Sequence, residues 1–245
     1  MLLNRLFENV KNQNWMSLWL ELMVVIVGIF LAIQVDRWYE SERRASEESE
    51  LLLALDEDFS ASRARLESVI SQHSAAAESA LKLLQAEANG PNSISYDEFY
   101  THLSHVQWTT TPNVARRTYD LLIASGDMDT IRDASLKAEM AAFFAVFDGR
   151  GSFVADELRD FSTNIWLPYL NSHLDHVALM QKVHANDTAF LNPTQSKDQY
   201  REVLGSPQFE GVIMAKWHLS RDYVFNLQRM LDSVDQIQGL LAQNL

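Results

Sequence analysis

Cysteine is absent from this chain of 245 residues. Its absence excludes disulfides, thiolate zinc sites, iron–sulfur clusters and cysteine nucleophiles. Glycine and proline are also scarce, with 8 and 5 copies, which is roughly half of their average usage or less. Because these residues interrupt helices and shape the turns of sheet proteins, their scarcity favours long helices over a sandwich, barrel or doubly wound sheet. We therefore predict an all-α protein.

Positive charge is scarce as well, since 20 Lys and Arg residues stand against 33 Asp and Glu, for a net charge of −13. Residues 1–44 carry as many basic as acidic side chains, so the whole excess of negative charge falls on the rest of the chain. A nucleic-acid-binding surface needs basic residues that displace counterions from the phosphates. The charge balance therefore argues against a nucleic-acid partner.

One long hydrophobic run is present. Between positions 16 and 35 only Ser17, Glu21 and Gln34 are polar, and twenty helical residues extend over about 30 Å, the thickness of a bilayer's hydrocarbon core. Aromatic residues typical of membrane interfaces lie at both ends, namely Trp15, Trp19, Trp38 and Tyr39. No small-residue cleavage site follows the run, so it does not match a signal peptide. We predict an uncleaved, single transmembrane helix with the lipid bilayer as its partner.

This helix divides the chain into three predicted parts. Residues 1–15 form a short cytoplasmic or interfacial segment, residues 16–38 the transmembrane helix, and residues 39–245 a helical extramembrane domain. Basic residues are distributed too evenly around the two ends of the transmembrane helix to determine its orientation.

Four residues form what we call the span face: Ser17, Glu21, Gly28 and Ala32. At 100° per residue they fall within an arc of about 60°. Gly28 and Ala32 make a small-xxx-small pair, which lets two helix backbones approach closely. We interpret the face as a packing surface in a homo-oligomer or against another membrane protein. Two alternatives are a Glu21 side chain that extends to the interface, and an oligomeric pore lined by Glu21.

A seven-residue repeat continues beyond the transmembrane helix, and nothing between Arg37 and Asn89 interrupts the helix. We call these ten positions the seam, and eight of them are apolar: Leu52, Leu55, Phe59, Ser62, Leu66, Val69, His73, Ala76, Ala80 and Leu83. Such spacing is typical of coiled coils and predicts a helix that packs along this line on partner helices. Gly90-Pro91 is expected to end it.

Start and stop signals predict the remaining helices of a bundle. They are a short helix after a capping box at Ser95 and Glu98, one from Pro112 to Gly126, one over residues 134–148 ended by Gly149, one over residues 152–184 kinked at Pro168, and a final helix from Ser206-Pro207 with Phe209, Ile213, Trp217, Val224, Leu227, Leu231, Val234 and Leu241 along one side.

Signals for chemistry are weak. Arg116 and Arg117 with Tyr119 nearby are the combination that an anion-binding pocket between helices would use, although such residues more often pair with carboxylates, which are abundant here. His102/His105 and His173/His176 have the spacing of metal ligands on a helix, but no Glu-x-x-His accompanies them. No nucleotide, hydrolase, kinase or metalloprotease motif is present. We therefore expect no enzyme, no metal and no cofactor.

Two segments resemble a family of uncharacterised bacterial single-pass membrane proteins. LELMVVIVGIFLAIQVDRWYE resembles that family's E-x-x-x-V-x-x-G-I-x-x-A-x-Q span through Glu21, Val25, Gly28, Ile29, Ala32, Gln34 and Trp38. TYDLLIASGDMDTIRDASLKAEM resembles its Tyr-x-x-Leu…Ser-Gly-x-Leu-x-x-Ile segment through Tyr119, Leu122, Ser125, Gly126 and Ile131, with Met128 in place of Leu. The resemblance implies a bacterial inner-membrane anchor, a cytoplasmic N-terminus and a helical periplasmic domain. It implies no activity.

These observations favour a non-enzymatic, membrane-anchored helical scaffold or accessory subunit that self-associates or docks on another membrane protein. The alternative is a periplasmic ligand-binding or sensory helical bundle that uses Arg116, Arg117 and Tyr119. An oligomeric pore is a third hypothesis.

Overall fold

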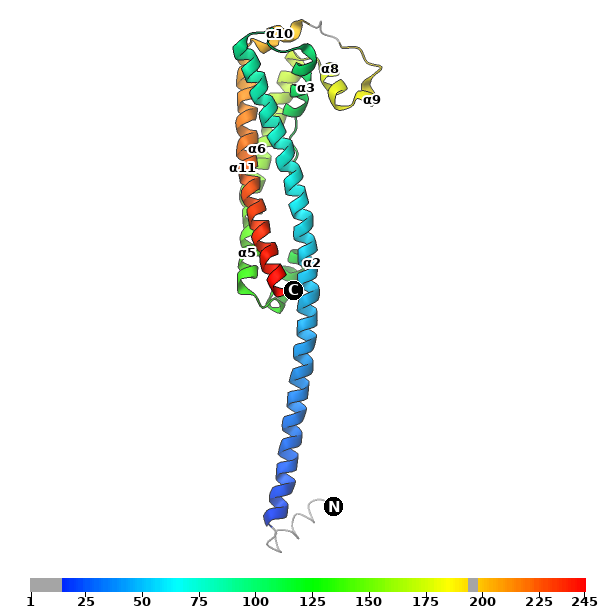
Figure 1. The fold of residues 1–245 in the computed structure, drawn as a ribbon, viewed down its shortest axis with the longest axis vertical. Coiled ribbons are helices and arrows are strands. Elements are labelled where there is room, and N and C mark those ends of the chain that lie inside the picture. The colour runs from blue at the N-terminus through cyan, green and yellow to red at the C-terminus, as the bar shows by residue number, and fades with distance from the viewer. Residues whose placement is uncertain (1–14, 194–197) are drawn as a thin grey trace. The chain divides into compact units, whose positions relative to one another are not determined.

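The computed structural model describes residues 15–193 and 198–245 (Figure 1). These residues form helices and irregular segments with no strand among them, which confirms the all-α prediction. The elements in chain order are α2 (Trp15–Asn89), α3 (Tyr96–Val106), α4 (Arg117–Ser125), the 3₁₀ turn η1 (Asp127–Thr130), α5 (Ala134–Val146), the π-helical stretch η2 (Phe147–Gly151), α6 (Ser152–Asp160), the π-helical stretch η3 (Phe161–Trp166), α7 (Leu167–His173), α8 (His176–Val183), α9 (Ala185–Thr188), α10 (Gln199–Leu204) and α11 (Pro207–Asn244).

The chain divides into two compact units, Met1–Leu52 and Leu53–Leu245. The boundary falls inside α2, so the predicted transmembrane helix continues without a break into the seam. Except for Trp15, the predicted short segment over residues 1–15 lies outside the described residues.

The apolar stretch of α2 has no face buried in the protein. Leu22, Met23 and Val24 are between 50% and 67% exposed, although these consecutive residues point about 100° apart around the helix. The most apolar window has a mean hydropathy of 2.4, and none of it is buried. A core helix of a water-soluble protein would bury at least one apolar face. Within the described chain, α2 alone is long and apolar enough to cross a membrane.

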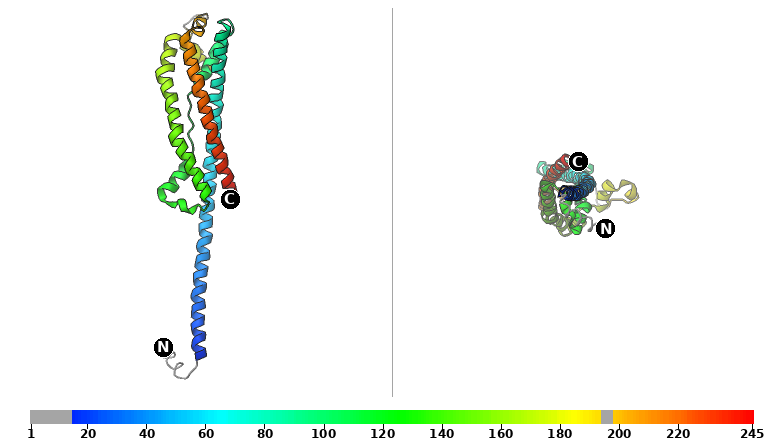
Figure 2. Two further views of the ribbon diagram at one scale, coloured as in Figure 1. Left: turned by 90° about the vertical axis from the view of Figure 1, so that its left-hand side faces the viewer. Right: turned by 90° about the horizontal axis from the view of Figure 1, so that it is seen from below.

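The seam is covered by the chain's own helices. All ten of its residues are buried. The Phe59 ring contacts the rings of Phe143 and Phe144 on α5, with centroids 5.6 and 6.0 Å apart. The His73 ring contacts Tyr223 on α11. The later half of α2 therefore runs beside α5 and α11 (Figure 2), and the partner helices that the repeat predicts lie within the same chain.

Two predicted helix boundaries are wrong in the same region. Gly149 does not end a helix, because η2 carries the backbone through it and joins α5 to α6. The helix predicted over residues 152–184 ends instead at His173, since Leu174 is extended and Asp175 caps α8. The helix widens into η3 immediately before Pro168, whose missing N–H and ring disfavour a regular α-helical turn there.

The other boundary signals are mostly confirmed. Gly90 and Gly126 follow the ends of α2 and α4 with φ of 97° and 78°, a left-handed conformation that favours glycine. The capping box of Ser95 and Glu98 begins α3, and Ser206 caps α11. Pro112 begins no helix, however. Residues 107–116 form an irregular segment, which we call the strap, and α4 starts only at Arg117.

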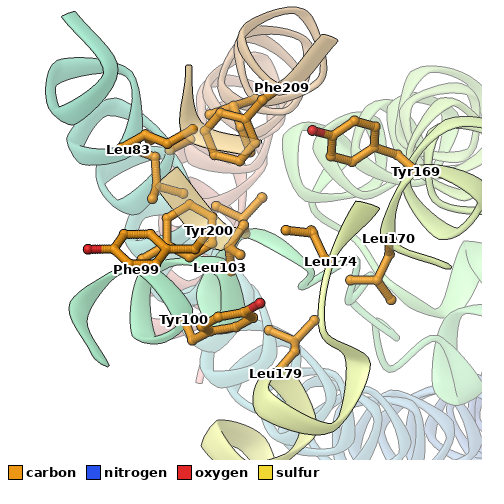
Figure 3. Close-up of a cluster of buried hydrophobic side chains, with 14 of the residues drawn as sticks. Leu83, Phe99, Tyr100, Leu103, Tyr169, Leu170, Leu174, Leu179, Tyr200 and Phe209 are labelled. Atoms are coloured by element: carbon orange, nitrogen blue, oxygen red, sulfur yellow. The ribbon is translucent and has the colours of Figure 1, made fainter. Parts of the chain in front are cut away.

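A second part of the core lies where α3, α8, α10 and the start of α11 meet the end of α2 (Figure 3). Phe99 contacts the rings of Tyr200 and Phe209 at 5.3 and 5.7 Å between centroids. The Tyr200 hydroxyl donates to the carbonyl of Ile94, and the Tyr100 hydroxyl accepts from the N–H of Asp175. These hydrogen bonds satisfy buried tyrosines and hold the chain at the breaks before α3 and α8.

Gly126→Ala should destabilise the protein by roughly 1 kcal/mol, because alanine must adopt a positive φ there. Gly149→Ala is the matched control: its added Cβ meets no atom within 4 Å, and alanine is favoured over glycine inside a helix. Urea unfolding of the full chain in a non-ionic detergent measures both changes. Equal destabilisation by the two substitutions would contradict the assignment of Gly126 as the positive-φ cap.

Candidate functional site: the span face and a buried polar cluster

The span face lies on the apolar stretch of α2. Glu21, Gly28 and Ala32 are exposed, whereas the side chain of Ser17 lies outside the description. A Cβ added to Gly28 would meet nothing within 4 Å. The helix surface at Gly28 is therefore open to a second helix, and a larger residue there would meet no obstacle within its own chain.

Two of the three residues predicted for an anion site, Arg116 and Tyr119, are engaged in contacts within the protein. The Arg116 guanidinium is already held by two carboxylates, with Nε 2.8 Å from Asp120 Oδ2 and Nη1 2.7 Å from Asp148 Oδ1. These hydrogen bonds raise the pKa of Arg116. Tyr119 stacks on Phe144 with ring centroids 4.3 Å apart, and Arg117 is exposed. An anion would have to displace Asp120 and Asp148, so this site remains a prediction with little support from the geometry.

The histidine pairs are also placed by the structure. His102 and His105 lie on α3 and approach one hydroxyl, Ser79 Oγ, at 3.3 and 3.0 Å from their Nδ1 atoms. His173 and His176 lie on either side of the break between α7 and α8. Within the described residues, no group of three or more His, Asp or Glu side chains is arranged to hold a metal ion.

The strap depends on side chains for its backbone hydrogen bonds. Lys216 Nζ donates to the carbonyl of Trp108, and His73 Nε2 lies 2.8 Å from the carbonyl oxygen of Thr110. Ser62 Oγ accepts from the N–H of Ala115 at 2.9 Å, and Arg65 Nη1 lies 2.7 Å from the carbonyl oxygen of Asn113. Ser62 and His73 belong to the seam, so these polar interruptions of the apolar repeat attach the strap to α2.

Lys216, His73, Ser220 and Tyr223 form a buried polar cluster, each 0% or 1% exposed. Burial lowers the pKa of Lys216 to about 8. Burial also lowers the pKa of His73 to about 4, with the hydrogen bond to Thr110 opposing this change and the charge of Lys216 adding to it. Because a carbonyl can only accept, His73 Nε2 carries the ring proton at neutral pH. His73 Nδ1 and Ser220 Oγ have no hydrogen-bond partner in the described structure.

The sequence analysis of α11 did not predict this cluster. It placed Trp217, Val224 and Leu231 on the apolar side of the helix, and these residues are only partly buried. The buried positions are instead spaced alternately by four and three residues: Phe209, Ile213, Lys216, Ser220, Tyr223, Leu227, Met230, Val234, Ile237 and Leu241. The heptad spacing that identified the seam identifies this second line equally well, provided that the polar Lys216 and Ser220 are accepted as core positions.

Comparison with known proteins returns no relative. No protein-family model matches the chain, and no curated protein or solved structure is significantly similar to it. The resemblance to an uncharacterised bacterial membrane family therefore stays a prediction.

Lys216→Met should remove a pH dependence of stability. With a folded-state pKa of about 8 against an ordinary value of 10.5, the unfolded chain binds more protons between these pH values. The free energy of unfolding of the natural protein therefore rises over this interval, by roughly 3 kcal/mol at most. Urea unfolding in a non-ionic detergent at pH 8 and 10.5 measures the difference between the two proteins. An equal rise in the variant would rule out a buried, charged Lys216.

His73→Gln tests the other buried base, with an amide that can still donate to Thr110. The folded-state pKa of about 4 lies below the ordinary 6.5, so the contribution of His73 is fully present above pH 6.5 and is lost as the pH falls to 4. The natural protein should lose up to roughly 3 kcal/mol more than the variant over this interval. Carboxylate titration is common to both proteins and cancels in the comparison. If the free energy of unfolding fell equally with pH in the natural protein and in His73→Gln, the lowered pKa of His73 would be contradicted.

Proposed function

We propose that this protein is a non-enzymatic, membrane-anchored helical scaffold or accessory subunit that associates with other membrane helices through its span face. The observation that carries the proposal is the exposed face of Glu21, Gly28 and Ala32 on the otherwise apolar stretch of α2. The partner is a second copy of the chain or another membrane protein.

Membrane physics explains why this face matters. Lipid tails solvate leucine and valine as well as another helix does, so apolar residues alone give little driving force for association. A glycine and an alanine four residues apart allow close backbone approach and van der Waals contact. A carboxyl group near the bilayer gains more from a hydrogen bond to a neighbouring helix than from lipid.

The helical domain supports this assignment because its seam is not available to bind a second chain. All ten seam residues are buried against the protein's own helices, so the seam has no apolar face left for a second chain. Association through the seam would require the unit to open. The span face requires no such change, because its described side chains are already exposed.

For location, we propose a bacterial inner membrane, a cytoplasmic N-terminus and a periplasmic helical domain. The resemblance described above is the support for each of these points. The strongly acidic composition of the chain after residue 44 is compatible with a large translocated domain, because translocation depends little on acidic residues.

Gly28→Ile should weaken the assembly by at least about tenfold, which corresponds to 1.4 kcal/mol. Its monomer should be unaffected, since space around Gly28 is open. Ile26→Phe is the matched control, because position 26 points about 160° away from Gly28 and a larger side chain there faces lipid. The measurement is the mass and composition of full-length protein extracted in polymer nanodiscs. Unchanged mass and co-purifying proteins in Gly28→Ile would refute association through this face.

A further inference from the structure

A cavity of about 310 Å³ lies between α5, η2 and α11, which is the lower end of the range for small-molecule sites. Its interior is apolar, from Phe143, Val146, Leu227 and Met230, while Arg150 and Arg229 contribute cationic groups. At roughly 30 Å³ for each water-sized group, it has room for about ten heavy atoms.

The two arginines have no carboxylate partner. Several other basic side chains of the domain do form ion pairs, as between Arg63 and Asp235 or Lys182 and Asp97. In the described structure neither Arg150 nor Arg229 has an ion pair or a side-chain hydrogen bond, and both are exposed. Asp148, two residues before Arg150, is already bound by Arg116 at 2.7 Å. Two free guanidinium groups thus line one apolar cavity in a protein with a large excess of negative charge.

The π-helical stretch accounts for the space. The wider turn of η2 contains Gly149 and Gly151, and a Cβ on Gly151 would meet Phe147 Cδ2 at 3.7 Å and Met230 Sδ at 4.0 Å. A side chain at position 151 would therefore reach the cavity wall. A second cavity, of about 250 Å³, shares Gly151, Tyr223, Leu227 and Met230 with the first. Single π-helical turns inside α-helices often occur at functional sites.

We propose that this cavity binds a small organic carboxylate with an apolar body. The carboxylate lies between Arg150 and Arg229, whose planar guanidinium groups can each donate two hydrogen bonds to it. The aryl or short alkyl group enters between Phe143 and Met230. The site is independent of the span face and differs from the Arg116 site predicted from the sequence, where the guanidinium is already occupied.

The test compares three probes of the same shape with the full-length protein in nanodiscs: 4-phenylbutyrate, 4-phenylbutanol and 4-phenylbutylammonium. Ligand-observed NMR, with empty nanodiscs subtracted, gives the dissociation constants. The carboxylate should bind at least tenfold more tightly than the alcohol, and the ammonium ion should bind most weakly. Acetate, which lacks the apolar body, should bind at least tenfold more weakly than 4-phenylbutyrate.

Variants locate the site. Arg150→Gln with Arg229→Gln should weaken 4-phenylbutyrate binding at least tenfold, while Val146→Ser should weaken it severalfold without a change of charge. Arg117→Gln is the control, since Arg117 is another exposed arginine and does not line the cavity. All substituted side chains are exposed, and circular dichroism checks that each variant folds. No binding of 4-phenylbutyrate, equal binding of the alcohol, or unchanged affinity in the double variant would overturn the proposal.

Discussion

The constraint on which the helical domain depends is that the strap's backbone must find hydrogen-bond partners among helices whose own backbone groups are already paired. An irregular segment beside a core has N–H and C=O groups that cost free energy when they are buried unpaired. Side chains of the neighbouring helices supply the partners: Ser62, Arg65 and His73 from α2 and Lys216 from α11. The polar residues Ser62, His73 and Lys216 thus interrupt the apolar heptad positions of α2 and α11 because they form hydrogen bonds with the backbone of the strap.

Burial of Lys216 and His73 makes this arrangement sensitive to pH. Both bases are held where water cannot solvate their charge, and the described structure shows no carboxylate bonded to either of them. The domain therefore tolerates one buried cation at neutral pH, Lys216, and a second one at His73 would add repulsion as well as desolvation cost. This absence of a carboxylate bonded to Lys216 or His73 contrasts with the surface, where ion pairs are frequent.

The strap also connects to the helix that contains η2. Arg116, its last residue, binds Asp148 on η2 and Asp120 on α4. That ion pair uses the carboxylate nearest in sequence to Arg150 and leaves Arg150 unpaired beside the apolar cavity. The anion site that we infer therefore depends on which arginines form ion pairs. Arg116 pairs with two carboxylates, whereas Arg150 and Arg229 pair with none in the described chain.

The sequence by itself determined the helical class, the apolar stretch that is long enough to cross a membrane, the seam, and the helix ends at Gly90, Gly126, Ser95 and Ser206, because these depend on local periodicity and on backbone preferences of single residues. It predicted neither the strap, nor the passage of the helix through Gly149, nor the break at Leu174. Only the tertiary structure decided these, since hydrogen bonds from residues up to 108 positions away in the sequence stabilise the irregular backbone. The same reason applies to the arginines: which of Arg116, Arg117, Arg150 and Arg229 is free depends on which carboxylates the fold brings near each of them.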